Sequence, residues 1–302
     1  MEGIQKNIQE QQYKKPGAGA VIGGVLAGST VNSLTSLSGQ FVKSGIMNKT
    51  GKLNNLITAD EFSQVEKAVS DTIKKSGLEA KGVGIIKATA ENADEISRIM
   101  SKELDKTFLK HLPKQVKEVV GSIYSSQVTS GENAFYSSAS KKIIMPEKKL
   151  GLALFHETGH AMNANLSKFG KILQKCRPMA MLMLPIAAIA LYKTKKAPGE
   201  EPKNNLDKAT TFIKNNAGKL TFAAFLPTLL EEGLASLKGN KVAKQLLSPE
   251  LAKKVAKTNA LGFSTYLLTA VLSSLGIYLG TKVKDAIAKP EPVLLSQEHQ
   301  IG

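Results

Sequence analysis

Three long stretches without a charged residue place the strongest limit on how this chain can fold. Thr258–Thr281 has 24 residues, Pro178–Tyr192 has 15 and Leu220–Leu230 has 11. A helix of the first length can cross about 30 Å of hydrocarbon, so we expect a transmembrane helix there. Lipid offers no partner for backbone hydrogen bonds, which favours helices throughout these stretches. The two shorter ones fit either a short membrane hairpin or buried core helices.

A fourth uncharged stretch, Gly17–Val42, is rich in glycine and serine. Gly19, Gly23, Gly24 and Gly28 fall at spacings that let two helices approach closely in a bilayer. Several hydroxyl and amide side chains dilute its hydrophobicity. Two interpretations therefore stay open, a membrane-inserted or hairpin-like segment and a flexible lead-in.

The chain is strongly basic, with 41 Lys and Arg against 25 Asp and Glu and a net charge of +16. Aromatic residues make up only 5% and tryptophan is absent, and no nucleic-acid-binding signature accompanies the lysines. We therefore expect no specific nucleic-acid partner, and instead attraction to an anionic lipid bilayer. The single cysteine, Cys176, excludes an internal disulfide.

Apolar spacing between the uncharged stretches predicts the remaining elements. Helices are expected over 59–75, 92–109 and 116–124, a strand over 82–88, a hairpin over Ala134–Met145, and a helix from Pro146 to Asn165. This gives a mainly α fold with a small β-hairpin or sheet and one to three membrane-associated helices.

The last of these helices carries an HExxH motif formed by His156, Glu157 and His160. Positions i and i+4 of a helix differ by about 40° around its axis, so both imidazoles leave the same face. Two neutral imidazoles in that arrangement can bind one Zn²⁺, and Glu157 can act as a general base beside it. The competing interpretation is a pair of surface histidines on an amphipathic helix.

A catalytic zinc needs a third protein ligand. An extended HExxHxxGxxH motif is absent, because Asn163 and Leu166 stand where it has glycine and histidine. The two other histidines, His111 and His299, lie outside any usual ligand spacing. A carboxylate is therefore expected to be the third ligand.

Glu231 and Glu232 are the best candidates, about seventy residues downstream. Ala235 and Ser236 share the face of Glu232, and such small residues would let its helix pack closely against the HExxH helix. Glu231 shares its face with the bulkier Leu234. We favour Glu232 as the ligand, with Glu231 as the alternative and a pair of solvated glutamates as the competing interpretation.

An HExxH motif followed by apolar segments and then an ExxA motif resembles the glutamate-ligand zinc peptidases, or gluzincins. Within them the chain resembles the integral-membrane family of HtpX-like proteases and CaaX prenyl endopeptidases, although Ser236 stands where that family has aspartate. The resemblance implies an α+β zincin-like core, a Zn²⁺ cofactor on His156, His160 and Glu232, and a protein or peptide substrate. It also implies that the hairpin Ala134–Met145 is the substrate-binding edge.

The sequence thus predicts a membrane-associated zinc endopeptidase that hydrolyses peptide bonds with a metal-activated water, with Glu157 as catalytic base and the site facing the cytoplasm. The alternative is a non-catalytic basic membrane protein with a structural or vestigial metal site. Tyr136 and Tyr266 are candidates for stabilising the oxyanion, although packing roles are favoured for both.

The expected organisation is an N-terminal Gly/Ser-rich, membrane-associated segment (1–50), a mainly helical region (51–130), a metallopeptidase core with an apolar hairpin (131–257), a transmembrane helix (258–282) and a polar tail (283–302).

Overall fold

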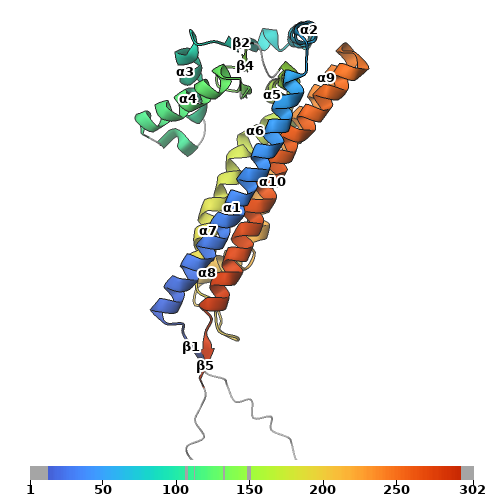
Figure 1. The fold of residues 1–302 in the computed structure, drawn as a ribbon. Coiled ribbons are helices and arrows are strands. Elements are labelled where there is room, and N and C mark those ends of the chain that lie inside the picture. The colour runs from blue at the N-terminus through green and yellow to red at the C-terminus, as the bar shows by residue number, and fades with distance from the viewer. Residues whose placement is uncertain (1–12, 106–107, 112, 132, 148–150, 294–302) are drawn as a thin grey trace, which may run out of the picture. The chain divides into compact units, whose positions relative to one another are not determined.

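The computed structural model of the chain describes residues 13–105, 108–111, 113–131, 133–147 and 151–293, and these are mainly helical (Figure 1), as predicted. The α-helices are α1 (Ala18–Asn55), α2 (Ala59–Lys75), α3 (Ala93–Leu104), α4 (Lys114–Thr129), α5 (Leu154–Leu166), α6 (Lys168–Cys176), α7 (Met183–Tyr192), α8 (Asn205–Asn215), α9 (Ala217–Leu246) and α10 (Pro249–Ile287). The strands are β1 (Tyr13–Lys14), β2 (Gly84–Ala88), β3 (Phe135–Ser137), β4 (Lys142–Pro146) and β5 (Glu291–Pro292), and short 3-10 turns are η1 (Glu79–Lys81), η2 (Phe108–His111), η3 (Gly151–Ala153) and η4 (Arg177–Leu182).

The chain divides into two compact units. The first comprises Met1–Leu37, Met183–Phe222 and Leu272–Gly302, and the second comprises Ser38–Leu182 and Ala223–Val271. Helices α1, α9 and α10 each supply residues to both units.

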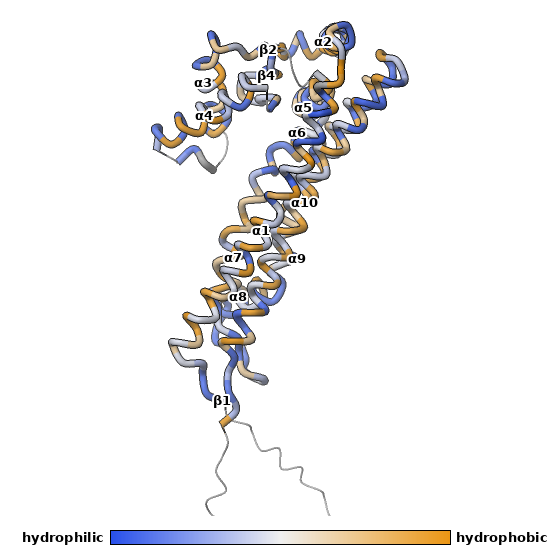
Figure 2. The backbone as a smooth tube through the Cα atoms, in the orientation of Figure 1, coloured by the Kyte–Doolittle hydropathy of each residue, from blue (hydrophilic) through white to orange (hydrophobic). Residues whose placement is uncertain are grey.

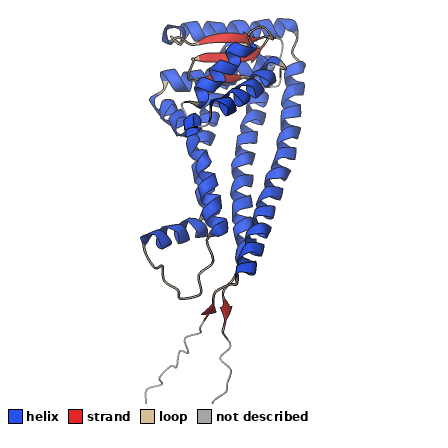
Figure 3. Ribbon diagram, turned by 90° about the vertical axis from the view of Figure 1, so that its left-hand side faces the viewer, coloured by secondary structure: helices blue, strands red, loops and turns tan. Residues whose placement is uncertain are grey.

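The second unit contains a three-stranded sheet, drawn in red in Figure 3. Its strand order is β2-β4-β3. β3 and β4 pair antiparallel, which confirms the predicted hairpin, and β2 adds to β4 in parallel. Ile143 and Met145 of β4 are fully buried in a core shared with α2 and α5. β3 is an edge strand of this sheet, and its Tyr136 amide is hydrogen-bonded to Glu157 of the HExxH helix.

Helix α5 begins at Leu154, whereas the sequence predicted a start at Pro146. Pro146 instead ends β4, where it pairs with Ala88 of β2. A proline has no amide hydrogen for the ladder. Pro146 is the last residue of β4 and lies beyond Ile144, where the pairing with β3 ends. The residues just after it, 148–150, lie outside the described part of the chain.

The first unit packs apolar helical segments against one another. Gly28 of α1 lies against Gly280 of α10 so closely that an added Cβ would be 2.5 Å from the Gly280 carbonyl oxygen. Ala190, Ala217 and Ile277 form a small buried core beside this contact. The glycine-rich stretch Gly17–Val42 therefore belongs to a regular helix from Ala18 onward, and its interpretation as a flexible lead-in is wrong.

Within the described residues, four helical segments are long and apolar enough to cross a membrane by length and composition: Ala18–Asn54, Lys168–Tyr192, Ala217–Leu246 and Pro249–Ile287. Figure 2 shows hydrophobic residues along α1, α7 and α10. Only 6% of the apolar window of Lys168–Tyr192 is buried, against 50% for Ala217–Leu246. The low burial of Lys168–Tyr192 favours contact with lipid along this segment. Half of the apolar window of Ala217–Leu246 is instead covered by other parts of the protein. Together the four apolar segments indicate membrane insertion.

Candidate metal centre

Helices α5 and α9 meet backbone to backbone in the second unit. A Cβ added to Gly159 would lie 2.1 Å from the Ala235 carbonyl oxygen, and one added to Gly239 would lie 2.4 Å from the Phe155 carbonyl oxygen. Real Cβ atoms do not approach that closely, so only glycine permits this crossing. The close approach brings side chains about seventy residues apart in sequence to one point between the helices.

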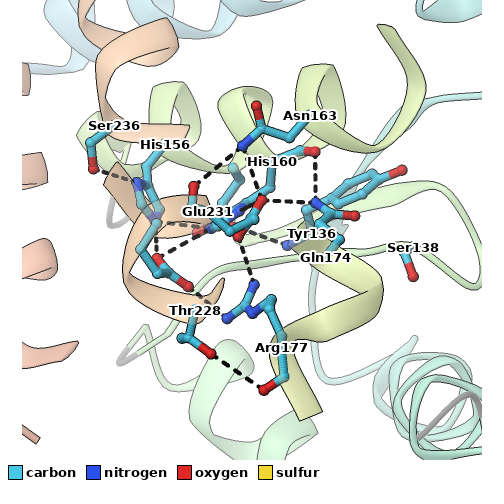
Figure 4. Close-up of polar contacts among 12 residues, drawn as sticks. Tyr136, Ser138, His156, His160, Asn163, Gln174, Arg177, Thr228, Glu231 and Ser236 are labelled. Atoms are coloured by element: carbon cyan, nitrogen blue, oxygen red, sulfur yellow. Dashed lines mark hydrogen bonds and ion pairs between the residues drawn. The ribbon is translucent and has the colours of Figure 1, made fainter. Parts of the chain in front are cut away.

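His156, His160 and Glu232 converge at that point. Figure 4 shows the two histidines with the side chains around them. One potential ligand atom from each lies within 4.8 Å of the others. The two Nε2 atoms are 3.0 Å apart, and Glu232 Oε2 is 3.0 Å from Nε2 of His156 and 3.5 Å from that of His160. Glu232 and His160 are buried, and His156 is the most exposed of the three, with 14% of its side chain accessible.

The other nitrogen of each ring also has an oxygen partner. Nδ1 of His156 lies 3.1 Å from Ser236 Oγ, and Nδ1 of His160 lies 2.9 Å from Glu231 Oε1. With a proton on Nδ1 donated to these oxygens, each Nε2 keeps a free lone pair directed at the shared point. A carboxylate or hydroxyl behind a metal-ligating histidine fixes its tautomer in this way.

Glu231 is held by a second layer of donors. Asn163 Nδ2 and Gln174 Nε2 each donate to Glu231 Oε1 at 3.0 Å. Arg177 joins the two glutamates, with Nη1 3.1 Å from Glu231 Oε2 and Nη2 2.6 Å from Glu232 Oε1. One oxygen of Glu232 is therefore bound by Arg177, and the other faces the histidines.

Glu157 of α5 reaches the edge strand β3. Its Oε2 accepts a hydrogen bond of 2.7 Å from the backbone N–H of Tyr136 in β3. Burial raises the pKa of this carboxyl, and nearby Glu232 raises it further, while His160, His156 and the Tyr136 amide counteract this in part. A carboxyl with a raised pKa is suited to exchanging protons near neutral pH.

The potential ligand atoms of His156, His160 and Glu232 fit a bound cation. Burial alone would lower the pKa of His160, but the Glu231 and Glu232 carboxylates outweigh it, so this pKa lies well above its ordinary value. The cluster thus attracts positive charge, either a proton or a metal ion. Two imidazole nitrogens and one carboxylate oxygen are the donors that a divalent transition metal takes.

The remaining candidates lie elsewhere or keep other roles. His111 is in η2 and does not belong to the cluster, and His299 lies outside the described residues. The Tyr136 hydroxyl accepts a hydrogen bond from Asn165 at 2.8 Å, and Tyr266 of α10 lies in the electrostatic field of Glu232 and Arg177.

Sequence reasoning missed Arg177, Gln174 and Asn163. Arg177 carried a signal that could have revealed it, because it is one of only two arginines in the chain and directly precedes the apolar run Pro178–Tyr192. Arg177 lies inside the candidate span Lys168–Tyr192, and a charged residue inside a membrane-type segment generally has a partner or a function.

Comparisons with protein families, with curated proteins and with solved structures find no match to this chain. The functional argument therefore rests on the geometry of the site.

Proposed function

We propose that the protein is a membrane-associated zinc-dependent endopeptidase. The observation that carries the proposal is the convergence of His156, His160 and Glu232, each oriented from behind by another side chain, next to a buried carboxyl that is not part of the triad. Structural zinc sites usually have four protein ligands, whereas three protein ligands and an open position are typical of catalytic sites.

His156 and His160 would hold the metal through Nε2 and Glu232 through Oε2. When bound, zinc lowers the pKa of a water molecule and polarises the carbonyl of the scissile peptide bond. Glu231 is assigned a supporting role, because its carboxylate already accepts from Nδ1 of His160 and from three neighbouring donors.

Glu157 is assigned the proton transfers. Its carboxylate takes a proton from the attacking water and returns it to the nitrogen of the leaving amine, so the carboxylate is regenerated in each cycle. The raised pKa of Glu157 supports both transfers, since a carboxyl of ordinary pKa holds a proton too weakly to deliver it.

The substrate is proposed to bind along β3. This strand pairs with β4 on one side only and ends the sheet, and an extended peptide can add to such an edge through backbone hydrogen bonds. The Tyr136 amide ties that edge to Glu157. A peptide along β3 would therefore lie beside the proposed base.

The test is a comparison of wild type with Glu157→Gln, purified in detergent. We expect the variant to keep zinc, measured by mass spectrometry of the metal, and to cleave a fluorescently labelled unfolded protein at least about 100-fold more slowly. Glu250→Gln, which changes an exposed glutamate in the first turn of α10, is the matched control and should leave both quantities unchanged. Equal turnover by wild type and Glu157→Gln would contradict the mechanism.

One observation favours a second candidate, a non-catalytic metal site. Glu231 and Glu232 are both fully buried and both paired with Arg177, an enclosed arrangement that also suits a structural ion. Stoichiometric zinc without proteolysis in any assay condition would favour this candidate. A folded wild-type protein that binds no zinc would exclude both.

A further inference from the structure

A basic pocket of about 880 Å³ lies in the first unit, and none of its lining residues belongs to the metal centre. Four segments line it: the chain around β1 before α1, the loop between α7 and α8, the start of α8, and the chain just after α10. Strand β1 pairs with β5, which joins the first and last of these segments (Figure 3). The charged lining residues are Lys15, Lys193, Lys195, Lys196, Lys203, Glu200 and Asp207.

The pocket has an excess of positive charge that its own carboxylates do not neutralise. Asp207 is shared by Lys193 and Lys196, the latter at 2.8 Å. Among the described residues, Lys15, Lys195 and Lys203 have no carboxylate within salt-bridge distance, although all three are exposed and line the same space. Three ammonium groups around one pocket attract an anion with several acceptor oxygens.

The position of the pocket indicates where such an anion would come from. Pro16 lies two residues before the candidate span Ala18–Asn54, Lys193 directly follows the span that ends at Tyr192, and Pro290 comes three residues after the span that ends at Ile287. The pocket thus lies at the ends of three apolar helical segments, which is the depth of lipid headgroups.

Two further features fit a lipid in place of a free anion. The lining includes Pro16, Leu206 and Pro290, apolar surface that a free phosphate would not use. Tyr192, at the end of α7, is 71% exposed, and tyrosine is enriched where a membrane meets water. Basic pockets next to spanning helices are known as binding places for anionic headgroups.

We propose that this pocket binds the phosphate-bearing headgroup of an anionic phospholipid through Lys15, Lys195 and Lys203. The proposal does not depend on the metal centre or on proteolysis, because no residue of the pocket belongs to that site. It assigns the basic loop between α7 and α8 a specific ligand in addition to a general attraction to a charged surface.

The test uses the full chain in neutral detergent and a fluorescent short-chain phosphatidic acid, with binding followed by anisotropy. The Lys15→Gln, Lys195→Gln, Lys203→Gln triple variant should lose about tenfold or more in affinity. The matched control is the Lys208→Gln, Lys219→Gln, Lys289→Gln triple, which removes the same charge from exposed lysines of the same unit outside the pocket, and should stay within about twofold of wild type.

Competition separates the possible sources of the phosphate. Unlabelled short-chain phosphatidic acid should displace the probe, whereas inorganic phosphate and short-chain phosphatidylcholine at the same concentration should not. Displacement by inorganic phosphate alone would overturn the lipid assignment, and equal loss in both triple variants would overturn the pocket. If the triple variant fails to fold, Lys195→Glu must weaken binding and Lys208→Glu must not, or the proposal is wrong.

Discussion

Two buried ionic clusters lie between helices of this protein, and they differ in the chemistry that they can perform. In the second unit, two glutamates are each paired with a histidine and with the same arginine, Arg177. In the first unit, Lys214 and Lys284 share Asp285, at 2.9 and 2.7 Å, and both lysines are buried. The first cluster has an excess of acceptors, and the second has an excess of donors.

Burial of charge does not by itself supply the ligand atoms that a metal ion needs. An ammonium group has only donors, so the lysine cluster offers a cation a single carboxylate that is already occupied. The histidine cluster offers lone pairs from three side chains, and each histidine is oriented by a partner at its other nitrogen. Orientation of lone pairs, and not enclosure, distinguishes the two regions.

The largest expected effect follows from removing the remote carboxylate. Because Glu232 is the proposed third ligand, Glu232→Ala should lower zinc affinity by more than about 100-fold, more than the loss of a supporting partner would. Zinc content after equilibration with a metal buffer measures this. The corresponding change in the other cluster, Asp285→Ala, should leave zinc content unchanged. Loss of zinc in both variants would contradict the inference that only the histidine cluster binds zinc.

Glu231→Gln sharpens the same distinction. Glu231 orients His160 without contributing to the triad, so we expect a loss of zinc affinity of about 10- to 100-fold, smaller than that of Glu232→Ala. Zinc titration of the two variants in parallel measures the order. A larger loss in Glu231→Gln than in Glu232→Ala would exchange the two assignments.

Close helix contact occurs in both units, but only one contact supports the metal centre. Gly159→Ala would place a Cβ 2.1 Å from the Ala235 carbonyl oxygen, so α5 and α9 must separate, with a loss of about 1–3 kcal/mol in stability and reduced zinc content. Gly28→Ala, which meets the Gly280 carbonyl oxygen at 2.5 Å, should destabilise the protein without reducing zinc content. Thermal unfolding and zinc analysis together check both.

Gly262→Ala is the control for these substitutions. A Cβ at Gly262 meets no atom within 4 Å, and the residue lies inside helix α10, so the change should stabilise by about 0.5–1 kcal/mol. Destabilisation by this variant would show that glycine substitution in these helices is harmful for a reason other than close contact.

The smallest expected effect is on the pH dependence of stability, through Lys214 in the cluster that it forms with Asp285 and Lys284. Burial lowers the pKa of Lys214 to about 8, with Lys284 lowering it further and Asp285 counteracting this. The unfolded chain then binds this proton more tightly than the folded one, so this lysine makes stability rise as pH increases from about 8 towards the ordinary lysine pKa of 10.5.

Lys214→Met should remove that rise, which we expect to be on the order of 1–3 kcal/mol. Unfolding midpoints between pH 7 and 10 measure it, with the exposed Lys208→Met on the same helix as control. An unchanged pH dependence in Lys214→Met would show that this lysine is not desolvated in the folded protein.

Much of the fold could be predicted from sequence because local periodicity and composition determine it. The hairpin around Phe135 and Ile143, helix α2 with its Thr58–Glu61 capping box, and the apolar helix of 258–281 all follow from patterns within a few residues. The start of α5 was mispredicted, since the parallel pairing that places Pro146 in a strand depends on β2, nearly sixty residues away.

The sequence by itself determined that His156, Glu157 and His160 share one helix, because a spacing of four residues is a property of helical geometry. It also narrowed the expected carboxylate partner of the two histidines to Glu231 or Glu232. Only the tertiary structure decided that Glu232 Oε2 meets both rings while Glu231 lies behind His160, and that Arg177 joins the two glutamates. The reason is that neighbouring residues on a helix point about 100° apart, so a crossing set by Gly159 and Ala235 chooses between them.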